Sequence, residues 1–129
     1  MMSDREQIYE LYVRYAFAID ARRYEEWIGY FTDGGVFDSS RLGRFEGREQ
    51  LRRFTETYER AREGGQTRHV LSNFNVEVAG DVANGACYLN LYLTKNGKTE
   101  MIGVGTYEDR LRKVGSRWLF ESRKVVTDR

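Results

Sequence analysis

The spacing of apolar residues along the first half of the chain predicts helices. In the first of them, apolar side chains recur every three or four residues, which is the period of an amphipathic helix. They are Ile8, Leu11, Tyr12, Tyr15 and Ile19. Ser3 with Glu6 three residues later forms a capping box before this run, so the helix begins there. Similar spacing predicts a short helix over Tyr24–Phe31 and a longer one over Arg48–Arg62, which ends before a Gly-Gly pair.

The second half of the chain has the aromatic and β-branched composition of strands. Four long strands are predicted, at Thr67–Val78, Ala83–Thr94, Thr99–Lys113 and Arg117–Val126. The turn dipeptides Gly80-Asp81, Asn96-Gly97 and Gly115-Ser116 separate them. Two shorter strands, at Val36–Asp38 and Gly43–Gly47, precede the third helix and form a hairpin. Three helices and a long antiparallel meander predict an α+β fold. A strongly bent sheet wrapped around the helices would leave a pocket open at one end.

Composition and charge narrow the class of protein. The 129 residues contain no proline and no repeat or low-complexity tract, so one domain over residues 1–129 is expected. The 21 Lys and Arg and 20 Asp and Glu are interspersed and leave a net charge of +1, which argues against nucleic-acid binding. Apolar runs are too short for a membrane span, and the polar N-terminus lacks the core of a signal peptide.

The presence of only one cysteine and one histidine argues against a disulfide-bonded protein and against a metalloprotein. Cys87 has no partner for an intrachain disulfide, which is consistent with a reducing, cytoplasmic location. Between Ala86 and Tyr88 on a predicted strand, it is typical of a small buried hydrophobe. One His and one Cys cannot supply a zinc or iron site of the usual type, so no metal is expected.

His69 is the first candidate for acid–base chemistry. It is the only histidine, and histidine is the side-chain type that exchanges a proton near neutral pH. Asp20 stands among apolar residues at the end of the first helix, where a carboxylate is costly unless it is paired. A His–Asp pair is a general way to make a base. Tyr15 could donate to a carbonyl or leaving oxygen, although its helical spacing also suits a core residue, and Arg123 could hold developing negative charge.

Each of these residues also has a purely structural interpretation. His69 at the start of a strand could be a hydrogen-bonded structural residue. Asp20 could cap the second helix, since Asp is a favoured cap residue. Arg123 could form an ordinary ion pair with Asp109 or Glu121.

Taken together, these patterns resemble a known family. The chain is similar to the SnoaL-like branch of the NTF2-like superfamily, in particular to the group that contains scytalone dehydratase, bile-acid 7α-dehydratase and the hexachlorocyclohexane dehydrochlorinase. The matching segments follow one another over nearly the whole chain. They are Ile8–Asp20, Trp27–Gly34, Phe45–Leu51, Arg68–Asn73, Val78–Ala83, Gly105–Leu111 and Gly115–Arg123. The resemblance implies a cone-shaped, mostly antiparallel sheet around three helices.

The resemblance also implies which residues act. The family's catalytic aspartate and histidine fall on Asp20 and His69, its tyrosine on Tyr15, and its late arginine on Arg123. Two positions depart from the pattern. Cys87 stands where scytalone dehydratase has a second pocket histidine, and Leu91 replaces an acid of the bile-acid enzyme.

The expected function is therefore a cofactor-independent lyase of the dehydratase type, which acts on a small, largely apolar oxygenated or cyclic compound through an Asp–His base. The expected partner is a small apolar, aromatic or cyclic ligand. The alternatives are a non-catalytic binding module, a protein like the small (beta) subunit of an aromatic-ring dioxygenase, or an isomerase or hydrolase that uses the same pocket. A homodimer is expected, with no nucleic-acid or membrane partner. The residues expected to contact the ligand are Phe17, Trp27, Phe31, Phe54, Asn73, Cys87, Leu89, Met101 and Tyr107.

Overall fold

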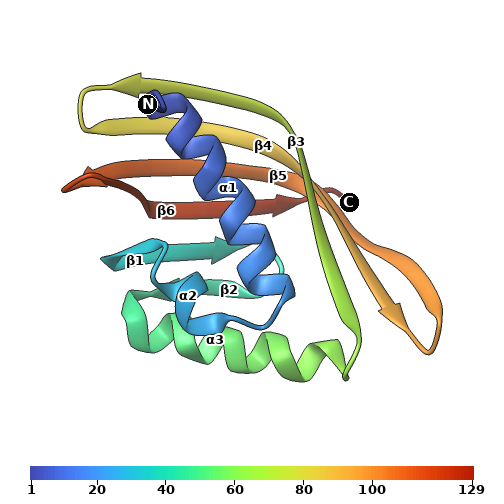
Figure 1. Ribbon diagram of the computed structural model, residues 1–129. Coiled ribbons are helices and arrows are strands. Elements are labelled where there is room, and N and C mark those ends of the chain that lie inside the picture. Colours follow the sequence, from blue (N-terminus) through green and yellow to red (C-terminus); the bar gives the residue numbers. More distant parts are fainter.

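Three helices lie against one curved, six-stranded sheet in the computed structural model, which describes all 129 residues (Figure 1). The helices are α1 (Asp4–Asp20), α2 (Tyr24–Ile28) and α3 (Gly47–Arg62). The strands are β1 (Phe31–Ser39), β2 (Gly43–Glu46), β3 (Gln66–Ala79), β4 (Val82–Lys95), β5 (Lys98–Val114) and β6 (Arg117–Thr127). The predicted α+β fold class is confirmed.

The strands follow the order β2-β1-β6-β5-β4-β3, and the sheet does not close. Strands β3 to β6 form the predicted antiparallel meander, whereas β1 runs parallel to β6. The turn at Asn96-Gly97 is confirmed, because both residues adopt the positive φ values of 51° and 75° that this turn type requires. The strand predicted at Val36–Asp38 is longer and starts at Phe31, with an irregular register between Phe31 and Val36.

Helix α1 begins at the predicted capping box. The Ser3 hydroxyl accepts from the Glu6 backbone N–H at 3.2 Å, and the Ser3 N–H donates to the Glu6 carboxylate at 3.3 Å. Figure 1 shows α1 crossing the inner side of the sheet, with α3 at the opposite end beside β1 and β2. This arrangement brings the C-terminal end of α1 close to the start of β3, where the candidate His69 lies.

The second helix is shorter than predicted. The expected helix over Tyr24–Phe31 ends at Ile28, and Phe31 already belongs to β1. The Phe120 N–H donates to the Tyr30 carbonyl at 2.8 Å, so the chain enters the sheet directly after the helix. Phe31 is buried by this strand pairing rather than by a helical stripe, and the two burial patterns look alike in the sequence.

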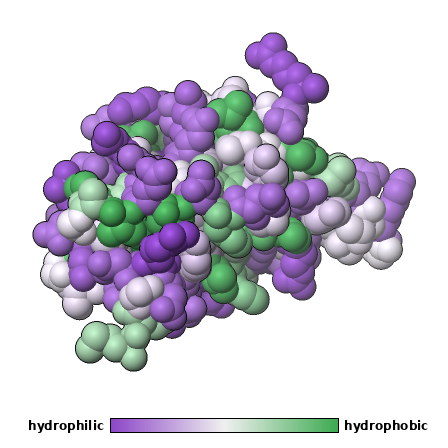
Figure 2. All heavy atoms as spheres, turned by 90° about the horizontal axis from the view of Figure 1, so that it is seen from above, coloured by the Kyte–Doolittle hydropathy of each residue, from purple (hydrophilic) through white to green (hydrophobic).

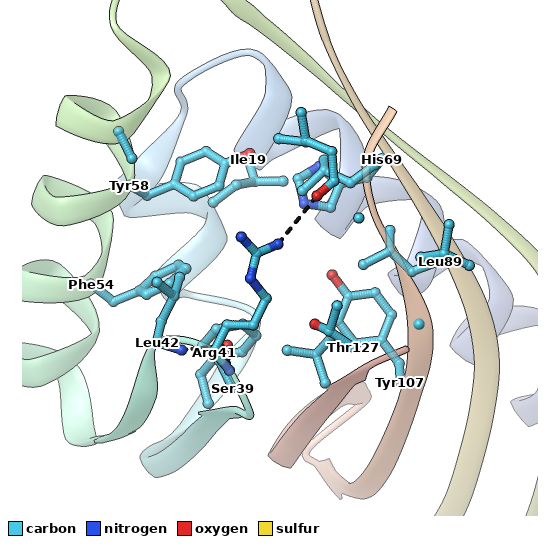
Figure 3. A pocket seen from close by; sticks show the side chains of 18 of the residues that line it. Ile19, Ser39, Arg41, Leu42, Phe54, Tyr58, His69, Leu89, Tyr107 and Thr127 are labelled. Carbon is cyan, nitrogen blue, oxygen red and sulfur yellow. Dashed lines mark hydrogen bonds between the residues drawn. The ribbon is translucent and has the colours of Figure 1, made fainter. Parts of the chain in front are cut away.

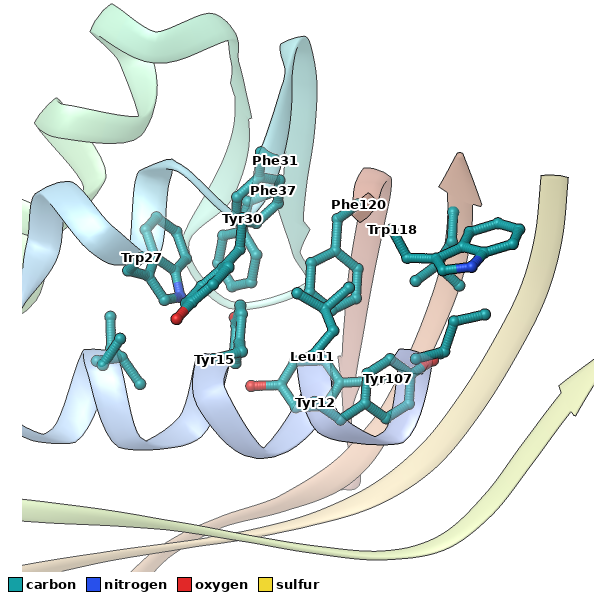
Figure 4. Close-up of a cluster of buried hydrophobic side chains, with 14 of the residues drawn as sticks. Leu11, Tyr12, Tyr15, Trp27, Tyr30, Phe31, Phe37, Tyr107, Trp118 and Phe120 are labelled. Atoms are coloured by element: carbon teal, nitrogen blue, oxygen red, sulfur yellow. The ribbon is translucent and has the colours of Figure 1, made fainter. Parts of the chain in front are cut away.

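The core is rich in aromatic rings. One cluster of 22 buried hydrophobic residues fills the space between the helices and the sheet (Figure 4). The Tyr15 ring lies at its centre, with ring centroids 5.6 Å from Trp27 and 5.5 Å from Phe120. Tilted and edge-to-face pairs of this kind add to the free energy of burial. The core therefore fixes the position of α1, the helix that carries Tyr15 and Asp20.

The surface is mixed in character. On the face seen in Figure 2, hydrophobic side chains form small groups among hydrophilic ones. None of the helices has the length and apolar character needed to cross a membrane.

Gly105 provides a test of how closely β5 and β6 approach. A Cβ at this position would collide with the backbone carbonyl oxygen of Val126, and it would lie 3.0 Å from the Thr127 Cα. We expect Gly105→Ala to lower the free energy of unfolding by about 1–3 kcal/mol, because the sheet must shift to accept the methyl group. Gly34→Ala is the matched control, since nothing lies within 4 Å of its added Cβ. Chemical denaturation of both variants measures the difference, and equal stabilities would contradict the prediction.

Candidate functional site

An apolar cavity opens between the helices and the inner face of the sheet. Its volume is about 200 Å³, and 13 of its 19 lining residues are hydrophobic. The lining comes from α1, α3 and five of the six strands, with two residues from the turn between β1 and β2 (Figure 3). Pockets with an apolar lining and few polar groups are typical of small-molecule sites.

Asp20 and His69 form a closely coupled pair at one side of this cavity. Asp20 Oδ1 lies 2.7 Å from His69 Nδ1, and Asp20 Oδ2 accepts from the His69 backbone N–H at 2.8 Å. The Thr67 hydroxyl donates to Oδ1 at 2.9 Å. An ionised carboxylate can only accept, so Nδ1 carries the hydrogen and the Nε2 lone pair stays free. His69 lines the cavity and Asp20 lies behind it. The alternative that Asp20 caps α2 is wrong, because α2 has no side-chain cap.

The surroundings of Asp20 favour its charged form. Burial acts to raise the pKa of this carboxyl, but the hydrogen bonds and charge of His69 and the Thr67 hydroxyl outweigh burial and lower the pKa. Only 6% of the His69 side chain and 9% of the Asp20 side chain are exposed. The pair is therefore screened from water, which strengthens the interaction between them.

Arg62 holds the end of α1 that carries Asp20. Its buried guanidinium donates from Nη1 to the Ile19 carbonyl and from Nη2 to the Asp20 carbonyl, each at 3.1 Å. Nε donates to the Gly65 carbonyl at 3.1 Å, which ties the same side chain to the start of β3. The cation also suits the negative end of the helix dipole. In the sequence Arg62 is one of two basic residues in the last turn of α3, so nothing there distinguishes it from Arg60.

Three tyrosines line the cavity beside His69. The Tyr15 hydroxyl is protonated at neutral pH, since burial raises its pKa while Arg123 acts in the opposite direction. Tyr107 faces the same space from β5. Tyr58 of α3 packs against the imidazole with ring centroids 6.2 Å apart, and its hydroxyl is buried without a hydrogen-bond partner. In the sequence Tyr58 follows Phe54 by four residues, a spacing that suits the apolar face of a helix, and nothing there indicates its contact with His69.

Arg123 does not line the cavity. Its guanidinium pairs with Asp109 through Nε at 2.9 Å and Nη2 at 3.3 Å, and both side chains are fully buried. The Tyr107 ring lies 3.5 Å from the guanidinium carbon, between Arg123 and the cavity. The expectation that Arg123 meets the ligand is corrected, and the ion-pair alternative with Asp109 is confirmed.

Of the other residues expected to contact the ligand, some line the cavity and some do not. Phe54, Leu89 and Tyr107 line the cavity as predicted. Trp27, Phe31 and Cys87 are buried but lie outside the lining, because the rings pack into the core and the thiol packs against Arg123. Phe17, Asn73 and Met101 also lie outside it, since each side chain is exposed to solvent. A shift of register at Ser72–Asn75, where Asn73 has a φ of 58°, changes the direction of that part of β3.

The site offers few side chains that could act as a covalent nucleophile or bind a metal ion. Burial raises the pKa of the Cys87 thiol to about 11, so the thiol is protonated at neutral pH and is a poor nucleophile. No three His, Cys, Asp or Glu side chains gather where they could hold a metal ion. The polar groups that face the cavity are His69, hydroxyl groups and the guanidinium of Arg41.

Helices packed on a curved, unclosed sheet around an apolar cavity are the architecture of the NTF2-like superfamily. Within that superfamily the chain belongs to the SnoaL-like family, since the model of the SnoaL-like domain matches residues 1–124. None of the curated proteins matches the sequence.

Solved structures share this fold. Rv3472 of Mycobacterium tuberculosis, described as of unknown function, is 31% identical, with 95% of this chain and 70% of that chain covered and a TM-score of 0.87. Aln2 from a Streptomyces species is 20% identical, with 99% and 94% covered and a TM-score of 0.89. An NTF2-like protein from Novosphingobium aromaticivorans is 22% identical, with 96% and 81% covered and a TM-score of 0.88.

The Asp20 carboxylate makes a testable contribution to stability. We expect Asp20→Asn to lower the free energy of unfolding at pH 7 by about 1–3 kcal/mol, because the amide presents hydrogens where the carboxylate accepts three bonds. The pKa of Asp20 is lower in the folded chain, so its carboxylate stabilises the fold above about pH 4 and loses this effect as the pH falls through the folded pKa. Denaturation curves of both proteins should therefore converge in acid, whereas a constant difference would refute the assignment.

Proposed function

We propose that this protein is a cofactor-independent lyase of the dehydratase type, acting on a small, largely apolar oxygenated or cyclic compound. The observation that carries the proposal is the 2.7 Å contact between Asp20 Oδ1 and His69 Nδ1 at the wall of an apolar cavity. This contact leaves the second ring nitrogen of the imidazole as a proton acceptor. A histidine needed only for packing would not require a buried carboxylate that accepts three hydrogen bonds.

The elimination uses His69 as the base. Nε2 takes the proton from a carbon next to an activating group, and the electron pair of that C–H bond forms the new double bond. The hydroxyl on the neighbouring carbon departs with the proton that His69 returns, so that one water is released. Asp20 stabilises the imidazolium that exists between these two proton transfers. The protonated Tyr15 hydroxyl donates a hydrogen bond to the departing oxygen.

The lining offers no thiol for nucleophilic catalysis. Cys87 lies outside the cavity, and no other thiol exists in the chain. An isomerase would use the same base but return the proton to another carbon of the same molecule. The products distinguish the two reactions, because only elimination releases water and creates a new double bond.

A panel of small β-hydroxy ketones and cyclic alcohols in deuterated water tests the proposal. Proton NMR follows the exchange of the hydrogen next to the carbonyl and the appearance of vinyl hydrogens. We expect at least one compound to be converted by the wild type and not by His69→Gln. Conversion that is equal in the two proteins, or no conversion across the panel, would count against the proposal.

A further inference from the structure

Arg41 is an unpaired cation at the cavity. Among the 19 lining residues it is the only Lys, Arg, Asp or Glu. None of the ion pairs in the structure includes it. Asp128 and Arg129 line an adjoining hollow that Arg41 also lines, but neither of them lines the cavity, and Asp128 forms no ion pair with Arg41. An exposed arginine on most surfaces needs no explanation, but this one extends over a mostly apolar space.

The turn that carries Arg41 is held firmly. The buried Ser39 hydroxyl accepts from the backbone N–H groups of Arg41 and Leu42, at 3.3 and 3.1 Å. The Ser40 N–H donates to the Val125 carbonyl at 3.0 Å, and the Ser40 hydroxyl accepts from the Thr127 N–H at 3.0 Å. These bonds tie the turn between β1 and β2 to β6. The base of the Arg41 side chain is therefore fixed relative to the cavity wall.

Most N–H donors of the Arg41 guanidinium have no partner in the protein. Nη1 donates to the Ile102 carbonyl at 3.2 Å, which is the only hydrogen bond of this side chain. Figure 3 shows the guanidinium in the space between Tyr58 and Tyr107, with His69 beyond it. A guanidinium has five N–H donors in a planar fork that matches a carboxylate. A single carbonyl leaves most of this capacity free for a ligand in the cavity that Arg41 lines.

We infer that Arg41 binds an anionic oxygen group of the ligand, and that this group is a carboxylate. The substrate of the site then joins an apolar body, which lies among the hydrophobic lining next to His69, to an acidic group that pairs with Arg41. The apolar lining makes such a charge pair stronger than one in open water. This inference concerns the same site as the proposed function and names its substrate class.

Two matched aromatic probes test the inference by binding alone. 2-Naphthoate carries a carboxylate, and 2-naphthamide has the same rings and a neutral amide of similar shape. Calorimetry measures each Kd, and the NMR signals of the single histidine show whether the probe lies next to His69. We expect the wild type to bind 2-naphthoate about tenfold more tightly than 2-naphthamide, as a charge-assisted bidentate hydrogen bond predicts.

Arg41→Gln should abolish this preference while the Kd of 2-naphthamide stays within about twofold. Arg44→Gln is the matched control, because Arg44 lies in the adjacent strand, pairs with Glu46 and does not line the cavity. An equal preference in the wild type and Arg41→Gln would overturn the inference, as would equal affinities of the wild type for the two probes or failure of 2-naphthoate to bind. None of these results depends on turnover, so the outcome is separate from that of the His69→Gln conversion assay.

Discussion

His69→Gln should reduce kcat by ~100- to 10,000-fold, measured on a compound that the wild type converts. This factor is the usual contribution of a general base. Glutamine is close in length and its amide can still donate to Asp20, so the buried carboxylate keeps a partner. It cannot accept and return a proton, however. The expected change is therefore a loss of the chemical step with a much smaller change in the free energy of unfolding.

The measurement needs a control that leaves the cavity intact. Arg68→Gln alters the adjacent residue of β3, whose exposed side chain points to the opposite face of the sheet. We expect this variant to keep the wild-type kcat. Steady-state kinetics of the three proteins, together with their denaturation curves, separate catalysis from stability. Full activity of a folded His69→Gln protein would remove His69 as the base, and the proposed elimination with it.

Arg123→Met should lower the free energy of unfolding by about 3–5 kcal/mol, because it leaves the Asp109 carboxylate buried without its partner. Both side chains of this pair are 0% exposed, so water cannot replace the lost interaction. The guanidinium carbon also lies 4.4 Å from the Tyr15 ring centroid and 3.5 Å from that of Tyr107. Cation–π contacts at such short range are lost in the same substitution.

A second substitution distinguishes the ion pair from general packing. We expect Arg123→Met combined with Asp109→Leu to recover most of the lost stability, since no buried charge then remains uncompensated. Lys124→Met, at the exposed neighbouring position on β6, should change the stability by no more than about 0.5 kcal/mol. Urea denaturation at neutral pH measures all of these variants. A double variant as unstable as Arg123→Met would show that packing, rather than charge, dominates.

The position of Arg123 has a consequence for the site. It supports Tyr107 from behind, so its substitution is expected to disturb the cavity wall without removing a group that meets the ligand. The family resemblance places Arg123 at the position of the family's late arginine. It does not reveal whether the guanidinium lies on the cavity side of the Tyr107 ring or behind it. That depends on Asp109, 14 residues earlier, which β5–β6 pairing places directly opposite it.

Local patterns were sufficient for most helices and strands. The capping box at Ser3, the helix over Arg48–Arg62 and the Asn96-Gly97 hairpin follow from neighbours in the sequence, and the structure confirms them. The interpretation failed at Phe31, where strand pairing with Phe120 ends the helical pattern early. A pairing partner nearly 90 residues away cannot be recognised from the few residues on either side of Phe31.

The fold class and the single candidate base could be predicted from the chain alone, because periodicity, turn chemistry and a lone histidine are local or compositional facts. The family followed instead from the resemblance of successive segments to its known members. Which side chains share the cavity depends instead on how the strands and helices pack. A register shift in β3 leaves Asn73 exposed, the Asp109 carboxylate draws Arg123 into the core, and a turn fixed to β6 brings Arg41 to the ligand space. Each outcome rests on contacts between residues that are distant in the chain, and their energies depend on burial that no local pattern records.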